Sequence, residues 1–238
     1  MTTLPFGRYP ALEGSDPDLL ARIGSAVRAR LDSAPSASRM PAQHLGMYIV
    51  RRFMSGEECA EMIALIDAGA KPSPMLSASR DTTIRTSQTC KLPPCDAVIR
   101  AERRIASLLG LPLAHGETLQ GQRYRPGEYF RMHNDYFAGA EPYSEVVAAE
   151  GGQRTWTAMV FLNEPKQGGC TSFPYAGIDV PPQTGSLLVW NNIDEEGLGN
   201  PYAHHQGLPV EAGTKYILTK WFREREWRAT PQSDAARY

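Results

Sequence analysis

From residue 115 onward, short runs of β-branched and aromatic residues alternate with turn signals, and this pattern restricts the chain to few folds. Turn residues such as Pro126-Gly127 and Gly168-Gly169 separate the runs. The predicted strands are 118–125, 155–162, 185–190 and 214–222. Helical spacing occurs before residue 115. Helices followed by many short strands are typical of a β-barrel or jelly roll that helices cover on one side.

Three stretches in the first half predict helices. In the first, over 16–32, apolar residues recur at helical spacing after Ser15, which can cap the helix. The second begins after the capping-box sequence Ser55-Gly-Glu-Glu58 and ends at Gly69. Asp96 caps the third, which a glycine and a proline close. These helices add to a fold that is mainly β.

The boundaries of the helical and β signals predict one principal domain. A segment rich in serine, alanine and proline follows the first helix and separates it from the rest. We therefore expect an N-terminal helical extension and linker over 1–45, a single domain over 46–228 and a C-terminal tail over 229–238. A segment at 72–95 has little periodicity, and long segments of this kind are often functional lids or disordered.

Charge and cysteine content exclude several classes of protein. The formal net charge is -1 and the sequence pI is about 6.5, so neither nucleic acid nor an anionic membrane is an expected partner. No apolar run has membrane-spanning length, and the first residues lack an apolar signal segment. The 4 cysteines are too few for a disulfide scaffold. We expect a soluble cytoplasmic protein with reduced thiols.

His133-Asn134-Asp135 is the first candidate for chemistry. In an extended backbone, residues 133 and 135 point to the same face, so an imidazole and a carboxylate could bind one metal ion. Two histidines and one carboxylate with open positions are typical of non-haem Fe(II) oxygenase sites. His204 and His205 are both candidates for the second histidine. The competing interpretation is a chance match, because so short a motif is common.

Lys215 is the second candidate. It lies near the start of the predicted strand 214–222, on which Ile217 and Trp221 share its face. If that face is buried, the lysine requires an anion, and a dicarboxylate cosubstrate would supply one. The alternative is a lysine that faces solvent, which its apolar neighbours on that face disfavour.

Taken together, the motifs resemble the Fe(II)- and 2-oxoglutarate-dependent dioxygenases, and within them the prolyl 4-hydroxylase group. The resemblance covers about residues 46–225 and rests on many motifs in one order. The matching motifs are Tyr124, His133-Asn-Asp-Tyr-Phe137, Gln153-Arg154-Thr-Trp-Thr157, Gly168-Gly-Cys-Thr-Ser-Phe-Pro174, Gly185-Ser-Leu-Leu-Val-Trp-Asn191, His205-Gln-Gly-Leu-Pro-Val210, Lys215 and Lys220-Trp221. The fold of that family is a double-stranded β-helix, a jelly roll with the metal in its mouth.

The resemblance also implies a role for each matched residue. The implied Fe(II) ligands are His133, Asp135 and His205; His205 is preferred to His204 because only it has Gly207 two residues later. Lys215 would bind the distal carboxylate of 2-oxoglutarate, helped by the hydroxyl groups of Tyr124 and Thr157. Substrate would contact Arg154, Trp221 and Phe130. Phe130 stands where the group often has tyrosine, so a hydroxyl group is lost at that contact.

The implied reaction is hydroxylation of an unactivated C–H bond with release of succinate and carbon dioxide. Dioxygen is the second cosubstrate, and ascorbate is an expectation from the family. A peptidyl prolyl residue is the expected substrate, and a free amino acid or small metabolite is the alternative. Two further hypotheses are a non-catalytic sensor that binds iron and 2-oxoglutarate, and a zinc hydrolase. The full set of metal and anion groups disfavours the sensor, and a hydrolase has no use for the lysine.

Overall fold

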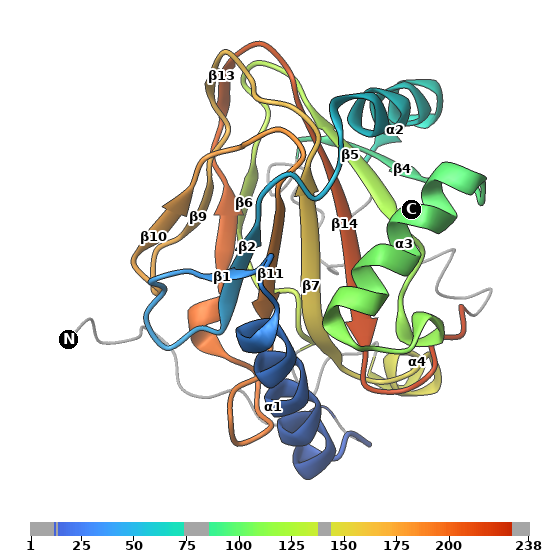
Figure 1. The fold of residues 1–238 in the computed structure, drawn as a ribbon, viewed down its shortest axis with the longest axis vertical. Coiled ribbons are helices and arrows are strands. Elements are labelled where there is room, and N and C mark those ends of the chain that lie inside the picture. Colours follow the sequence, from blue (N-terminus) through green and yellow to red (C-terminus); the bar gives the residue numbers. More distant parts are fainter. Residues whose placement is uncertain (1–11, 13, 74–85, 138–143, 230–238) are drawn as a thin grey trace.

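The computed structural model describes residues 12, 14–73, 86–137 and 144–229. Two antiparallel sheets face each other, and helices α2 and α3 lie on the outer side of the larger sheet (Figure 1). The larger sheet has the order β1-β2-β11-β7-β14-β5-β4-β3, and the smaller sheet has the order β10-β9-β12-β6. A short pair, β13-β8, lies apart from them. This arrangement of strands confirms the predicted jelly roll with flanking helices.

The bounds of the elements follow the predicted ranges closely in the long elements. The helices are α1 (Pro17–Ser33), α2 (Gly56–Gly69), α3 (Asp96–Leu109) and α4 (Ser144–Ala149), with 3-10 turns η1 (Leu113–His115) and η2 (Pro201–Ala203). The strands of the larger sheet are β1 (Ser38–Arg39), β2 (Met47–Val50), β3 (Lys71–Pro72), β4 (Gln88–Lys91), β5 (Gln120–Tyr124), β7 (Arg154–Phe161), β11 (Leu187–Asn191) and β14 (Lys215–Arg223). The others are β6 (Phe130–His133), β8 (Gln167–Gly168), β9 (Thr171–Phe173), β10 (Ile178–Val180), β12 (His205–Gly207) and β13 (Val210–Ala212).

The helix caps correct the predictions in two places. The cap of α1 is Asp16, whose carboxylate accepts from the Asp18 amide, while the Ser15 hydroxyl donates to Glu224. In α3, Asp96 is already the first helical residue. The capping box of α2 is present as predicted. Both corrections move the cap by one residue, which is within the usual uncertainty of a helix boundary.

Strand β14 separates two hydrophobic clusters, and this separation positions the site. Leu218 and Phe222 belong to the cluster under the helices, whereas Ile217 belongs to the cluster between the sheets. Lys215 has the same parity as Ile217 and is also buried. The predicted inward face of this strand is therefore confirmed.

The N-terminal helix packs against the β-domain beside the chain that follows His133. Leu20 of α1 forms a small buried cluster with Tyr136 and Ile193. The linker after α1 includes β1, which pairs with β2 at the edge of the larger sheet. Part of the predicted lid also joins this sheet, in β3 and β4, and residues 74–85 lie outside the described residues.

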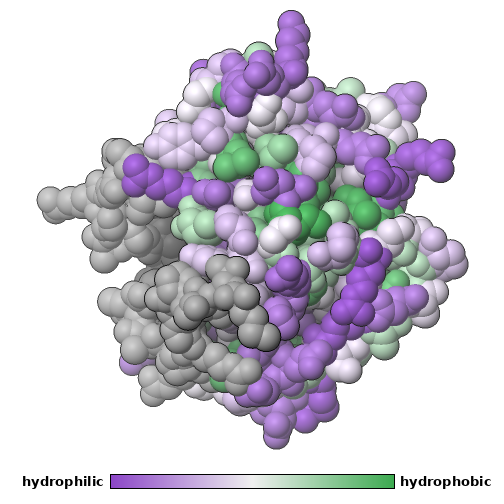
Figure 2. Space-filling model, turned by 90° about the vertical axis from the view of Figure 1, so that its left-hand side faces the viewer, coloured by the Kyte–Doolittle hydropathy of each residue, from purple (hydrophilic) through white to green (hydrophobic). Residues whose placement is uncertain are grey.

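The surface beside β9 and β10 gathers hydrophobic residues near its centre, within a hydrophilic border (Figure 2). Among the described residues, no helix combines the length and the apolar character that crossing a membrane requires.

Candidate metal centre

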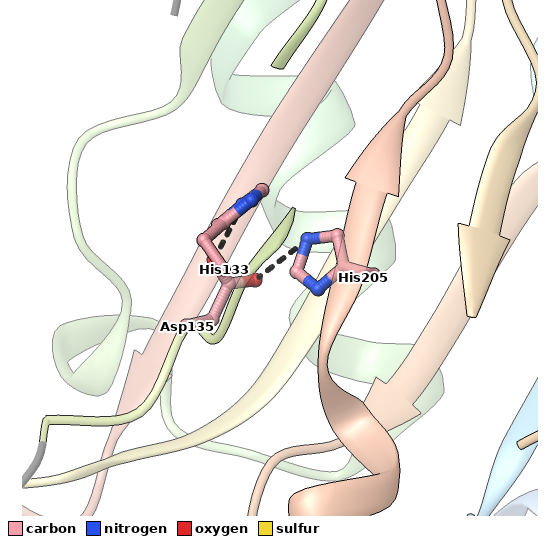
Figure 3. A group of neighbouring side chains, drawn as sticks. All are labelled: His133, Asp135 and His205. Atoms are coloured by element: carbon pink, nitrogen blue, oxygen red, sulfur yellow. Dashed lines mark ion pairs between the residues drawn. The ribbon is translucent and has the colours of Figure 1, made fainter. Parts of the chain in front are cut away.

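Three predicted ligands meet in the smaller sheet. His205 on β12 lies directly opposite His133 on β6 in the strand register. Asp135 follows His133 by two residues, just beyond the end of β6. Their side chains point toward one another, and their ligand atoms all lie within 4.8 Å (Figure 3).

The distances between these ligand atoms suit a shared ion. His133 Nε2 is 3.8 Å from Asp135 Oδ1, and His205 Nε2 is 3.9 Å from Asp135 Oδ2. Both distances are too long for a hydrogen bond. Two atoms that each lie about 2.1 Å from one ion are at most about 4.2 Å apart, so both pairs fit a common ligand sphere.

Hydrogen bonds on the far side of each imidazole orient the rings for metal binding. His133 Nδ1 is 2.8 Å from the carbonyl oxygen of Arg131, and His205 Nδ1 is 3.0 Å from that of Ala203. A carbonyl oxygen only accepts, so each Nδ1 must carry the proton. Each Nε2 then presents its lone pair to the centre of the site, as in metal sites whose histidines are held by a carbonyl.

Aromatic rings enclose the two histidines. Phe130 stacks on His133 with ring centres 3.6 Å apart, and Phe173 stacks on His205 at 5.2 Å. Trp190 meets the ring of His205 edge-on at 4.9 Å. These contacts restrict the rotation of both imidazoles and exclude water from one side of the site. They also place Phe130, a predicted substrate residue, against a candidate metal ligand.

Asp135 is ionised despite its burial. Burial alone would raise the pKa of Asp135, but His205, His133 and Arg154 together with a hydrogen bond from Thr157 hold it below its ordinary value. The Thr157 hydroxyl donates to Asp135 Oδ2 at 2.7 Å and accepts from the Asn192 side-chain amide at 2.9 Å. The carboxylate is therefore fixed in the charged form that binds metal.

Thr157 does not lie where the resemblance implied. In the sheet it pairs with Trp221, which is six positions along β14 from Lys215. Six residues of a strand span roughly 20 Å, so the Thr157 hydroxyl cannot assist Lys215 in binding one carboxylate. Its hydrogen bond to Asp135 indicates a different role, in holding a candidate metal ligand.

Lys215 is a buried cation that faces polar and aromatic groups. Its Nζ is 3.4 Å from Thr171 Oγ1 and lies 5.4 Å from the ring centre of Tyr124 and 5.7 Å from that of Phe161. Burial lowers the pKa of Lys215 to about 8. Among the residues that the structure describes, no carboxylate pairs with it. A bound anion would supply the missing charge.

The remaining predicted residues lie in three places: two beside Asp135, one beside Lys215 and one turned away from the ligand group. Arg154 and Trp221 are buried and stack on each other, with the guanidinium carbon 4.1 Å from the ring centre. The Tyr124 hydroxyl donates to Gln122, and its ring lies beside Lys215. His204 is turned away, with Nδ1 3.1 Å from the Pro201 carbonyl oxygen and its ring beside Tyr136 and Tyr175.

Three contributors were not identified from the sequence. Thr171 belongs to a quoted glycine-rich motif, yet only the structure places its hydroxyl against Lys215. Asn192 and Glu117 lie outside the quoted motifs and contact the site through Thr157 and Arg154. Only Thr171 lies in a motif that the sequence analysis used. Asn192 and Glu117 have no such signal, because contacts between side chains far apart in the sequence leave no local pattern.

Comparison with known proteins agrees with this geometry. The sequence model of the 2OG-Fe(II) oxygenase superfamily matches residues 119–223. Prolyl 4-hydroxylase 5 of Arabidopsis thaliana is 31% identical over 210 residues, which cover 76% of this chain and 69% of that protein. Prolyl 4-hydroxylase 1 of the same plant is 30% identical over 202 residues, or 74% of this chain and 68% of that protein.

A solved structure shows the same likeness. The viral collagen prolyl hydroxylase of Paramecium bursaria Chlorella virus 1, in its 2OG complex, superimposes with a TM-score of 0.59 at 25% sequence identity, over 74% of this chain and 94% of that one. With the relatives and the three converging ligands, this shows that the chain belongs to the 2-oxoglutarate- and Fe(II)-dependent oxygenases and is a member of their prolyl 4-hydroxylase-like group.

Proposed function

We propose that this enzyme hydroxylates a peptidyl prolyl residue, with Fe(II) held by His133, Asp135 and His205. The observation that carries the proposal is the convergence of these three ligand atoms within 4.8 Å beside a buried lysine that has no carboxylate partner among the described residues. A zinc hydrolase would not require that lysine. The names of the relatives support a peptidyl substrate over a free amino acid or metabolite.

The role proposed for each residue follows from its position in the site. Bound iron and 2-oxoglutarate would supply, with dioxygen, the oxidation of a C–H bond to an alcohol, with succinate and carbon dioxide as the other products. The two imidazole Nε2 atoms and the Asp135 carboxylate would hold the ion, and a set of two histidines and one carboxylate is typical of sites with positions left for other ligands. Lys215 binds the distal carboxylate of the cosubstrate, and the Thr171 hydroxyl fixes the ammonium.

Succinate release in the presence of a prolyl peptide tests the proposal directly. We expect one succinate per oxygen atom added to the peptide, and no stimulation by free proline. His205→Ala should abolish succinate release and peptide hydroxylation. His204→Ala, the matched control one residue away, should retain both activities. If free proline stimulates succinate release and no prolyl peptide does, the result favours a small-molecule substrate instead. The same assay with and without ascorbate tests whether ascorbate sustains turnover, as we propose for this group.

A further inference from the structure

We propose that Gln153 and Arg154 are positioning residues for the metal-binding carboxylate of Asp135, and that Arg154 acts through Asp135 instead of touching the substrate. The inference rests on the proposed metal site. It assigns a single task to the sequence Gln153-Arg154-x-x-Thr157: all three polar side chains bind the segment Asp135–Phe137.

Gln153 binds the main chain of this segment as a neighbouring strand would. Its side-chain oxygen accepts from the Phe137 amide at 2.7 Å, and its side-chain nitrogen donates to the Phe137 carbonyl at 2.8 Å. The same oxygen also accepts from the Arg154 amide at 3.0 Å. Gln153 is only 3% exposed, so both halves of its amide depend on these partners. The chain directly after Asp135 is thereby fixed at Phe137.

Arg154 is held by an ion pair, a hydrogen bond to the main chain and two aromatic contacts. Its Nε and Nη2 donate to the two carboxylate oxygens of Glu117 at 2.6 and 2.8 Å, and its Nη1 donates to the Asp135 carbonyl oxygen at 3.4 Å. The guanidinium carbon also lies over two aromatic rings, 4.1 Å from the ring centre of Trp221 and 4.9 Å from that of Phe137. A substrate could reach this guanidinium only by displacing a buried bidentate ion pair, which is strongly unfavourable.

A bulge in β7 brings Arg154 to the same side as Thr157. Trp221 lies opposite Thr157 and Phe222 opposite Trp156, but Arg223 lies opposite Arg154, so the register shifts by one residue between the last two pairs. In a regular strand, residues 154 and 157 would point to opposite faces. A bulge redirects a side chain, and such irregularities are common beside active sites. Here it allows one side chain to reach the Asp135 carbonyl and the other its carboxylate.

Metal binding without substrate separates the two possible roles of Arg154. We measure the dissociation constant of Mn(II) by calorimetry in the absence of peptide, and then the KM for a prolyl peptide. If Arg154 positions Asp135, Arg154→Met weakens Mn(II) binding by about tenfold or more and leaves the peptide KM within about twofold of the wild type. The matched control is Arg123→Met, which removes the ion pair between Arg123 and Asp67 on the helical side of the sheet.

Two further variants keep the test decisive if Arg154→Met does not fold. Glu117→Gln preserves shape but removes the charge that holds Arg154, and Gln153→Glu replaces the donor to the Phe137 carbonyl with a negatively charged oxygen that repels it. Each is expected to weaken Mn(II) binding several-fold. Folded variants that bind Mn(II) as the wild type does overturn the inference, whatever happens to the peptide KM. A wild type that binds Mn(II) but hydroxylates no prolyl peptide contradicts the proposed function and leaves this comparison intact.

Discussion

At the scale of single residues, Lys215 has the most measurable consequence. Its side chain is buried, its pKa is lowered to about 8, and its nearest hydrogen-bond partner, Thr171, is uncharged. Only the ammonium form attracts a carboxylate. Below pH 8 the free site therefore carries the charge that 2-oxoglutarate needs, and above pH 8 an increasing share of the protein must take up a proton before it binds.

We predict that the KM for 2-oxoglutarate is constant below about pH 8 and rises about tenfold per pH unit well above it. Lys215→Met should give a high KM that does not change with pH. The exposed Lys166→Met is the control and should follow the wild type. Initial rates of succinate release from pH 7 to about pH 9.5 measure this, and a flat wild-type profile would contradict it.

The residue scale also shows what the sequence could and could not predict. The convergence of His133, Asp135 and His205 was implied by the resemblance, because the residues alone left His204 and His205 both open. The burial of Lys215 was predictable from the apolar residues that share its face. The partner of the Thr157 hydroxyl was not, because it depends on register: Thr157 pairs with Trp221, far along β14 from Lys215. Arg154 was expected at the substrate, but its donors are directed to Glu117 and Asp135.

At the scale of elements, α1 is close enough to the site to influence it. Leu20 packs on Tyr136, the residue after Asp135, and on Ile193. The loop after Ile193 then passes so near the helix that the main chain of Pro17 occupies the space of a side chain at Gly197. The helix therefore packs against two segments, those of Tyr136 and Ile193, that lie next to residues of the candidate metal site. The helix was predictable from the spacing of its apolar residues. The surface against which it packs was not predictable, because a local pattern does not show which distant residues the helix contacts.

The approach of α1 predicts a difference between two glycines of similar backbone conformation. Gly197 has φ +79°, and a Cβ there would overlap Pro17; Gly127 has φ +85°, and nothing lies within 4 Å of its Cβ position. Gly127→Ala should cost about 1–2 kcal/mol, the strain of a left-handed conformation. Gly197→Ala should cost that strain and in addition the displacement of α1, for a total of about 3–5 kcal/mol. Urea unfolding measures both, and equal losses would show that α1 is not held by this contact.

At the scale of the whole molecule, a metal ion would connect the two sheets. His133 and His205 lie on adjacent strands of the smaller sheet, while Asp135 is hydrogen-bonded to Thr157 in the larger one. The jelly roll itself was predictable, because its strands and turns are local signals in a fixed order. The pairing of β6 with β12 joins residues far apart in the sequence, and only the resemblance to a family implied it.

Because the ion binds the folded chain through groups that unfolding separates, metal should stabilise the whole domain. With Mn(II) at about 100 times its dissociation constant, the free energy of unfolding should rise by about 2.7 kcal/mol. His133→Ala should lose this gain, because two ligands on separate strands no longer close the site. His115→Ala, on η1 and outside the ligand group, should retain it. Chemical denaturation with Mn(II) and with a chelator measures the difference. If Mn(II) still raises the free energy of unfolding of His133→Ala, the stabilising ion is bound elsewhere. The stabilisation must come from the groups that hold the ion in the folded chain.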